Sequence, residues 1–431
     1  MRLTLLAAAA LSVAAQNFDV ALIGDTPYGA ANEPRFERVI ADINRHAVDF
    51  SIHIGDTKNG SSRCDNSHYT KVLNWFNSFD SGLLYTPGDN EWTDCMRANN
   101  GAYDPLDRLA LVRKTYYTTN QTLGRRPLPV MRQSEDSKFS LYVENAMLVR
   151  GPVVFATIHA VGSNNNLQYT TVQGARNSFY DNDKEFIARN EANVAWLKKA
   201  FATARTNKSL GVLIAMQGNL FDGFFEAGTG STRSGFEDII KVLREETAAF
   251  KGEVVLVAGD SHYMRVDKPL TALFPACTAA TGECKPYDAP LDGRGARALN
   301  FTRVEVPGSG DVHWMVCHVR PGSRNIFSFE FMVVPDVPAG AAVTAAIAGP
   351  ATVESNSPQV GLDASGSTSP NSGDLTYAWS AAPGYPQAAI LNANTATPVV
   401  QMSTRGEHQF VVKVTDRTGT SATASVKVRY Y

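Results

Sequence analysis

The sequence has no large excess of charge of either sign. Its 40 lysines and arginines are balanced by 42 aspartates and glutamates, so the formal net charge is -2. A protein that binds nucleic acid through a wide basic surface is therefore not expected. After the first fifteen residues, no stretch is long and apolar enough to span a bilayer. Hydrophobic residues make up 44% of the 431 residues, which favours a globular chain of two or three domains.

The beginning of the chain has the features of a secretory signal peptide. One arginine precedes an apolar run rich in Ala and Leu, which ends in the small residues Val13-Ala14-Ala15. The run is short for a membrane helix, so we expect residues 1–15 to be cleaved near Gln16 and the protein to be secreted. Four sequons agree with export and would carry glycans in a host that adds them; they begin at Asn59, Asn120, Asn207 and Asn300.

Cysteine is scarce, and none of the five cysteines has the spacing of a zinc cluster. In an exported chain an odd number leaves at least one thiol unpaired. We predict one disulfide between Cys64 and Cys95 and a second between Cys277 and Cys284. Cys317 lies in an apolar run and is predicted to be a buried thiol.

Charged residues become rare near residue 336, where Ala, Gly, Ser, Thr and Val begin to dominate. Two prolines and a glycine in the stretch 334–340 predict a linker at 335–340, between a domain at 16–334 and a second at 341–431. Short alternating segments separated by turns predict an antiparallel β-sandwich after the linker. The segments 362–367, 375–379 and 412–416 resemble a PKD domain, an immunoglobulin-like module. That resemblance implies a spacer or adhesion module, and a glycan or cell-surface partner.

One motif recurs in the larger domain: an apolar run of strand length followed by Gly-Asp. The aspartates of its four copies are Asp25, Asp56, Asp89 and Asp260. Segments of helical spacing lie between them, which indicates an α/β sheet covered on both faces. The carboxyl ends of parallel strands meet at one crevice, so the four carboxylates are expected to converge. Like charges so close together require a cation, and a metal site is predicted, with His262 as a nitrogen ligand.

The order of these motifs resembles that of the calcineurin-like metallophosphoesterases, which include the purple acid phosphatases. The motifs are Gly24-Asp25, Gly55-Asp56, Gly88-Asp89-Asn90-Glu91 and Gly259-Asp260-Ser261-His262. The resemblance implies a two-layered β sandwich flanked by helices and two divalent metals bridged by Asp56. It implies metal ligands at Asp25, Asp56, Asp89, Asp260 and His262, and at Gln217 or Asn219 in place of the family's lone histidine. Tyr28 is a further candidate beside the first metal.

Several family histidines are replaced here. Carboxylates and amides are harder ligands than imidazole, so Mn²⁺, Mg²⁺, Fe or Ca²⁺ is expected in preference to Zn²⁺. Asn90 stands where the family has a phosphate-contacting histidine; it donates a hydrogen bond but does not titrate. Slow turnover, an activated leaving group or another acid would be needed, and Glu91, His159 and His68 all remain open as that acid. The polar run 164–166 is a further candidate for holding substrate oxygens.

Two functions follow from this sequence. The first is a secreted, metal-dependent phosphoesterase that hydrolyses a small phosphomonoester or phosphodiester through a metal-activated water, with Asn90, Asp56 and His262 as catalytic residues. The second is a catalytically inactive, metal-stabilised extracellular protein whose C-terminal sandwich binds a glycan or a cell surface. The lost histidines favour the second function, and the four retained Gly-Asp turns favour the first.

Overall fold

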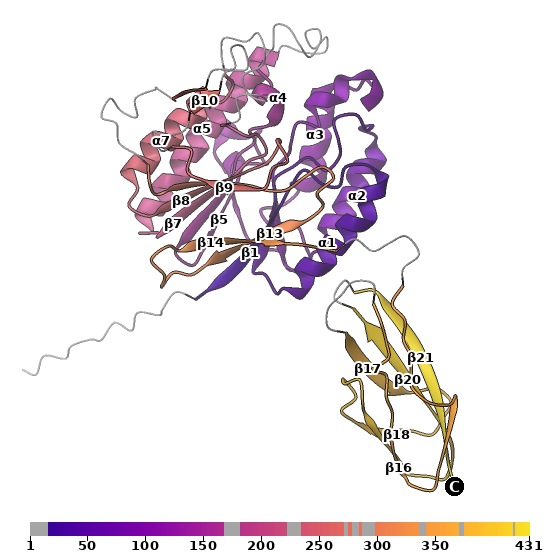
Figure 1. Ribbon diagram of the computed structural model, residues 1–431. Helices are drawn as coiled ribbons and strands as arrows, with labels where there is room; N and C mark the ends of the chain where they lie inside the picture. The colour runs from indigo at the N-terminus through magenta and orange to yellow at the C-terminus, as the bar shows by residue number, and fades with distance from the viewer. Residues whose placement is uncertain are drawn as a thin grey trace, which may run out of the picture. The chain divides into compact units, whose positions relative to one another are not determined.

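The computed structural model describes residues 16–167, 182–221, 234–270, 275–277, 284–286, 298–335, 342–369, 375–416 and 419–431. The chain divides between Val333 and Val334 into two compact units (Figure 1). The predicted signal peptide and residues 336–340 of the predicted linker lie outside the described residues. None of the described helices is long and apolar enough to cross a membrane.

The N-terminal unit contains a five-stranded sheet in the order β14-β13-β1-β2-β3. Its strands are β1 (Phe18–Ile23), β2 (Phe50–His53), β3 (Gly82–Tyr85), β13 (Trp314–Val319) and β14 (Phe327–Met332). The first three strands are parallel, whereas β13 and β14 each run antiparallel to their neighbours. The carboxyl ends of β1, β2 and β3 therefore lie at the same edge of this sheet.

A second sheet of seven strands has the order β4-β5-β6-β7-β8-β12-β9. Its strands are β4 (Met131–Arg132), β5 (Ala146–Arg150), β6 (Val153–Thr157), β7 (Gly211–Ala215), β8 (Glu253–Ala258), β9 (Arg265–Asp267) and β12 (Phe301–Glu305). The four central strands β6, β7, β8 and β12 are parallel, and the outer pairs are antiparallel. Separately, β10 (Pro275–Cys277) pairs antiparallel with β11 (Cys284–Pro286).

The two sheets pack face to face through alternate side chains of their strands. Leu22 and Ile52 of the first sheet share one buried cluster with Phe155 and Val257 of the second. The intervening residues of β6, β7 and β8 point to the opposite face, as the period of two in a strand requires. There Ile214 and its neighbours pack against helices in a second cluster.

Helices cover both outer faces of this sandwich. Those of the N-terminal unit are α1 (Glu33–Arg45), α2 (Asn66–Phe76), α3 (Pro105–Tyr116), the short α4 (Gly162–Asn165), α5 (Asn182–Thr206) and α7 (Glu237–Ala249). Helices α5 and α7 lie on the seven-stranded sheet, where Trp196 and Leu243 are buried (Figure 1). Phe36 of α1 and Phe76 of α2 contact the ring of His53 on the five-stranded sheet. The predicted α/β fold, a two-layered sandwich flanked by helices, is thus confirmed.

The C-terminal unit is a sandwich of two small sheets, in the orders β15-β21-β20-β17 and β16-β19-β18. Its strands are β15 (Thr352–Ser355), β16 (Gln359–Gly361), β17 (Thr376–Ala381), β18 (Ala388–Leu391), β19 (Val399–Met402), β20 (Gly406–Thr415) and β21 (Ser421–Tyr430). Trp379, Val400 and Phe410 form its core. The predicted β-sandwich is confirmed, although β15 pairs with β21 in parallel and not antiparallel.

The cysteines of the described residues agree with two of the three predictions. Cys64 and Cys95 form a disulfide with their Cα atoms 5.7 Å apart, and Cys317 is a buried free thiol. Cys277 and Cys284 are opposite each other in the β10–β11 ladder, but their side chains lie outside the described part of the chain. The second disulfide therefore stays a prediction.

The aromatic contacts of Phe155 generate a test of the sheet packing. Its ring lies 4.9 Å from that of Phe50 and 6.2 Å from that of Phe18, across the two sheets. We expect Phe155→Ala to lower the free energy of unfolding by about 3–5 kcal/mol, because the neighbouring strands cannot fully close the cavity. Urea unfolding followed by tryptophan fluorescence measures this loss. The control Leu141→Ala, at a side chain 60% exposed, should change it by less than about 0.5 kcal/mol; equal effects of the two variants would contradict the packing described.

Candidate metal centre

Each of the four Gly-Asp turns follows the carboxyl end of a parallel strand. Asp25, Asp56 and Asp89 come after β1, β2 and β3 of the five-stranded sheet, and Asp260 comes after β8 of the other sheet. The backbone N–H of Asp25 donates to the carbonyl of Gly55 at 2.9 Å, which joins the first two turns. The four carboxylates, here called the carboxylate cluster, therefore lie where the edges of the two sheets meet.

The glycines before these aspartates are required by the neighbouring turns. A Cβ atom at Gly88 would lie 2.0 Å from Oδ1 of Asp56, and one at Gly259 would lie 2.0 Å from Oδ2 of Asp25. Any larger residue would push a carboxylate out of its position. Packing thus explains why glycine precedes these aspartates, since the glycine of one turn makes room for the aspartate of another.

The backbone of the cluster is strained. Asp25, Asp56 and Asp260 have φ values of 50°, 55° and 67°, and His262 has 63°. Residues other than glycine rarely adopt this left-handed region, which costs about 1–2 kcal/mol for each. Such strain persists where the surrounding structure holds it, and it is concentrated at functional sites.

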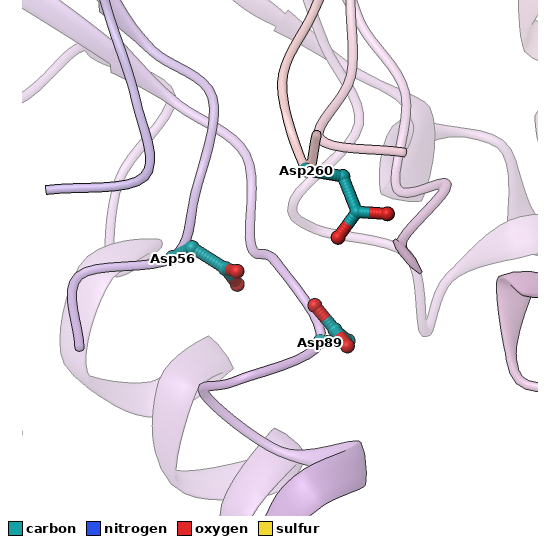
Figure 2. Close-up of side chains that lie close together, drawn as sticks. All are labelled: Asp56, Asp89 and Asp260. Atoms are coloured by element: carbon teal, nitrogen blue, oxygen red, sulfur yellow. The ribbon is translucent and has the colours of Figure 1, made fainter. Parts of the chain in front are cut away.

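Three carboxylates of the cluster point toward one another (Figure 2). One oxygen each of Asp56, Asp89 and Asp260 lies within 4.8 Å of the other two. Asp25 adjoins them, because both of its oxygens accept the backbone N–H of Asp260, at 3.2 and 3.1 Å. Oδ1 of Asp89 is buried and has no hydrogen-bond partner among the described residues. A buried carboxylate oxygen without a donor needs a cation or a proton.

The electrostatics of the cluster favour a bound cation or proton. Burial, and after it the charge of Asp260, hold the pKa of the Asp25 carboxyl well above its usual range. Burial and the charge of Asp89 act in the same direction on the pKa of Asp56. A divalent ion among these groups would favour their ionised forms and reverse both shifts.

Tyr28, Asn90 and His262 form a hydrogen-bonded chain at Asp56. The Tyr28 hydroxyl donates to Oδ2 of Asp56 at 2.8 Å, and Nδ2 of Asn90 donates to the same oxygen at 2.6 Å. Nε2 of His262 lies 3.2 Å from the Tyr28 oxygen. With the Tyr28 proton donated to Asp56, the contact with His262 is a hydrogen bond in the tautomer that carries its proton on Nε2. Tyr28, left open by the sequence, therefore belongs to the site.

Of the two amides predicted in place of the family's lone histidine, only Gln217 reaches the cluster. Its Nε2 donates to Oδ2 of Asp56 at 3.3 Å and to Oδ1 of Asp260 at 3.0 Å. Its oxygen instead accepts the backbone N–H of Gly162, so it would have to leave that bond to bind a metal. Asn219 is engaged elsewhere, with Ser261, Glu305 and Arg303.

The three candidates for a general acid are all engaged in contacts with other groups. Glu91 accepts the backbone N–H groups of Asp56 and Gly88 at 3.1 and 2.8 Å, so it fixes two of the turns. His68 contacts the Thr57 hydroxyl at 3.1 Å. His159 is fully buried, and its Nδ1 lies 2.8 Å from Oε1 of Glu144. His262, one-third exposed, is the imidazole that adjoins the cluster.

The expectation that residues 164–166 hold substrate oxygens is wrong. All three asparagines are buried in a left-handed turn, and their side chains bond within the protein. Asn165 accepts from Arg189, Asn164 accepts the N–H of Gly235, and Asn166 donates to Glu185. The turn instead aims Ser163 at the cluster, where its hydroxyl donates to Oδ2 of Asp89 at 2.7 Å. Ser163 was not predicted, and the sequence offers no signal for it beyond a polar residue soon after a strand.

Lys58 was also missed by the sequence analysis. It follows Asp56 by two residues and is only 3% exposed. Burial lowers the pKa of its ammonium, while the charges of Glu91, Asp94, Asp56 and Asp89 oppose that shift. A lysine soon after a strand end is too common to have been singled out.

The residues present fit a divalent cation. Four carboxylates supply the oxygen donors that hard cations prefer, and His262 adds one nitrogen. The orphaned oxygen of Asp89 lies among them. The donor set agrees with the expectation of Mn²⁺, Mg²⁺, Fe or Ca²⁺ in preference to Zn²⁺, and the identity and number of the ions stay predictions.

Residues 348–429 match a family model that describes a PKD domain. The C-terminal unit is PKD-like. Among solved structures, the PKD domain from KIAA 1837 protein is 22% identical, with a TM-score of 0.17, and the match covers 22% of this chain and 91% of that chain. A search of curated proteins found no match.

Two further solved structures are similar over 96% of this chain. A nucleoside hydrolase-related hypothetical protein from Saccharophagus degradans is 11% identical, with a TM-score of 0.19, over its full length. A purple acid phosphatase from yellow lupin (Lupinus luteus) seeds is 12% identical, with a TM-score of 0.37, and this chain covers 54% of it. At these values any statement about activity has to rest on the site itself.

Metal binding is tested by a graded pair of variants around Asp89. Asp89→Asn removes a ligand, whereas Ser163→Ala removes only the donor that orients it. We expect Ser163→Ala to weaken Mn²⁺ binding by about 10–100-fold, as is usual for a partner of a ligand, and Asp89→Asn to weaken it further. Calorimetric titration with Mn²⁺ measures both. The exposed Asp80→Asn should bind as the unchanged protein does, and equal binding by all three variants would refute the site.

The buried group of Arg113, Glu144 and His159 makes stability depend on pH. Burial alone would raise the pKa of Glu144, but Arg113, at 2.6 Å, and His159 hold it well below its usual range. This stabilisation is present above the unfolded value of 4.5 and is lost as the pH falls through the folded-state pKa. Glu144→Gln should therefore cost about 3–5 kcal/mol at neutral pH and progressively less below about pH 4.5.

Urea unfolding between pH 3 and pH 7 checks this expectation. Asp80→Asn breaks an exposed ion pair with Arg125 and should cost less than about 1 kcal/mol throughout. A loss on Glu144→Gln that stays constant over this range would show that the ionised carboxylate is not what stabilises the fold.

Proposed function

We propose that the protein is a secreted, metal-dependent phosphoesterase that hydrolyses a small phosphomonoester or phosphodiester. The observation that carries the proposal is the convergence of buried Asp56 and Asp89 with Asp260, including one carboxylate oxygen to which no described residue donates. The order of the four Gly-Asp motifs, which resembles that of the metallophosphoesterases, supports the same function. Divalent ions bound there would supply Lewis acidity to a phosphoryl oxygen and to the attacking water.

The side chains around the cluster supply binding and proton chemistry. The Asn90 amide, in place of a titrating histidine, fixes Asp56 and leaves proton transfer to another group. His262 is one-third exposed, and its Nε2 contacts the Tyr28 hydroxyl that donates to Asp56, so this nitrogen would serve either as a metal ligand or as a proton donor. Gln217 bridges Asp56 and Asp260 and thereby links the two sheets across the site.

We further propose that the C-terminal PKD-like unit acts as a spacer or attachment module. The family match and the core of Trp379, Val400 and Phe410 support an independently packed module. A glycan or cell-surface partner would fit a secreted enzyme with such a module. Export itself is inferred from the apolar, Ala-rich residues 1–15.

The activity is tested on chromogenic aryl phosphate monoesters and diesters, with Mn²⁺, Mg²⁺, Fe²⁺ and Ca²⁺ supplied in turn. We expect hydrolysis with at least one ion and its loss in EDTA. Asp56→Asn should lower kcat/KM by at least about 100-fold, because charge stabilisation by a bound ion is worth several kcal/mol. Asp80→Asn serves as the control. Bound metal without turnover of any ester would instead favour the inactive, metal-stabilised binding protein.

A further inference from the structure

Lys58 is a buried ammonium whose hydrogen-bonding capacity is largely unused. It is 3% exposed, and among the described residues its Nζ donates to one acceptor, the carbonyl oxygen of the adjacent Asn59, at 3.0 Å. No ion pair joins it to a described carboxylate. Because an ammonium has three N–H donors, two remain to be satisfied. A charge buried in this way is costly unless an anion completes its coordination.

The neighbouring carboxylates do not satisfy the remaining N–H donors of Lys58. Glu91 and Asp94 act most strongly on the charge of Lys58, followed by Asp56 and Asp89. Glu91 already accepts backbone N–H groups of two turns, and Asp94 pairs with Arg97. Asp56 and Asp89 belong to the carboxylate cluster. Lys58 is therefore a cation beside the candidate metal centre and not the partner of one particular carboxylate.

The segment after Asp56 lies against the residue expected to contact phosphate. A Cβ atom at Gly60, two residues after Lys58, would lie 2.9 Å from Oδ1 of Asn90. A cavity of about 320 Å³ reaches Lys58 and Thr57 and continues past Pro27 and Gly29, which flank Tyr28. Lys58 thus borders a space whose lining includes Thr57, the residue after Asp56, and both chain neighbours of Tyr28.

We propose that Lys58 is the anion-binding residue of this site and donates to a non-bridging oxygen of the substrate's phosphoryl group. The inference rests on the proposed phosphoesterase function and deepens it. Lysine binds phosphate as a compact point charge, so it would supply the attraction that Asn90 cannot provide. A fixed positive charge favours a doubly charged phosphomonoester over a singly charged diester, and monoesters are therefore the substrate class.

Binding of inorganic phosphate to the Mn²⁺-loaded protein, measured by calorimetry, tests the proposal. Lys58→Met keeps an unbranched side chain of nearly the same length and removes its charge, and it should weaken phosphate binding by about 10–100-fold. The matched control is Lys71→Met, because Lys71 lines the same cavity but pairs with Glu33; it should change binding by less than about twofold. The Mn²⁺ content of Lys58→Met should equal or exceed that of the unchanged protein, since a repelling charge is removed.

A second readout separates recognition from folding. In Lys58→Met the ratio of kcat/KM for aryl monoester to that for diester should fall by about tenfold or more, and Lys58→Arg should restore part of it. Unchanged phosphate binding and an unchanged ratio in Lys58→Met, with Mn²⁺ still bound, would overturn the role of Lys58 and leave the phosphoesterase proposal standing. Absence of Mn²⁺ binding and of turnover in the unaltered protein would overturn both.

Discussion

The mutual repulsion of four carboxylates at one edge of the sandwich is the constraint on which the rest of the site depends. Asp25 and Asp56 are almost completely buried, so little water screens them from Asp89 and Asp260. The fold holds the carboxylates together by backbone features that normally cost free energy. Three of the aspartates have left-handed backbone conformations, and the neighbouring glycines leave no room for a side chain. Glu91 and the Cys64–Cys95 disulfide secure the segments behind them. Such an arrangement is stable at low cost only when positive charge is supplied to it.

The features that sequence patterns could predict are those that depend on local order. Each apolar run followed by Gly-Asp predicted both a buried strand and a residue of the site, because parallel strands place their carboxyl ends at a common edge. The assignment of Asp260 to the same site as Asp25 needed no detailed geometry beyond this rule. The C-terminal sandwich followed in the same way from alternating segments, and Trp379 lies in its core.

The features that could not be predicted depend on contacts between distant segments. Whether Gln217 presents its oxygen or its nitrogen to the cluster is decided by Gly162, 55 residues away in the chain. Asn164, Asn165 and Asn166 look like an exposed polar loop until the structure shows the N–H of Gly235 and the side chain of Arg189 bound to two of them. Ser163 and Lys58 acquire their roles only through tertiary neighbours. Side-chain direction and burial, and not residue type, separate these positions from ordinary loop residues.

Access to the cluster bears on the choice between an enzyme and a metal-stabilised binding protein. A purely structural metal site is closed by its ligands, whereas a catalytic one keeps a position open to solvent or substrate. Asp25 is fully buried, but Asp260 is half-buried and the side chain of His262 is one-third exposed. These two more exposed candidate ligands both come from the turn after β8 of the seven-stranded sheet. A donor set of four carboxylates and one imidazole with partly exposed members is not sealed, and this agrees with the proposed phosphoesterase function better than with a purely structural metal site.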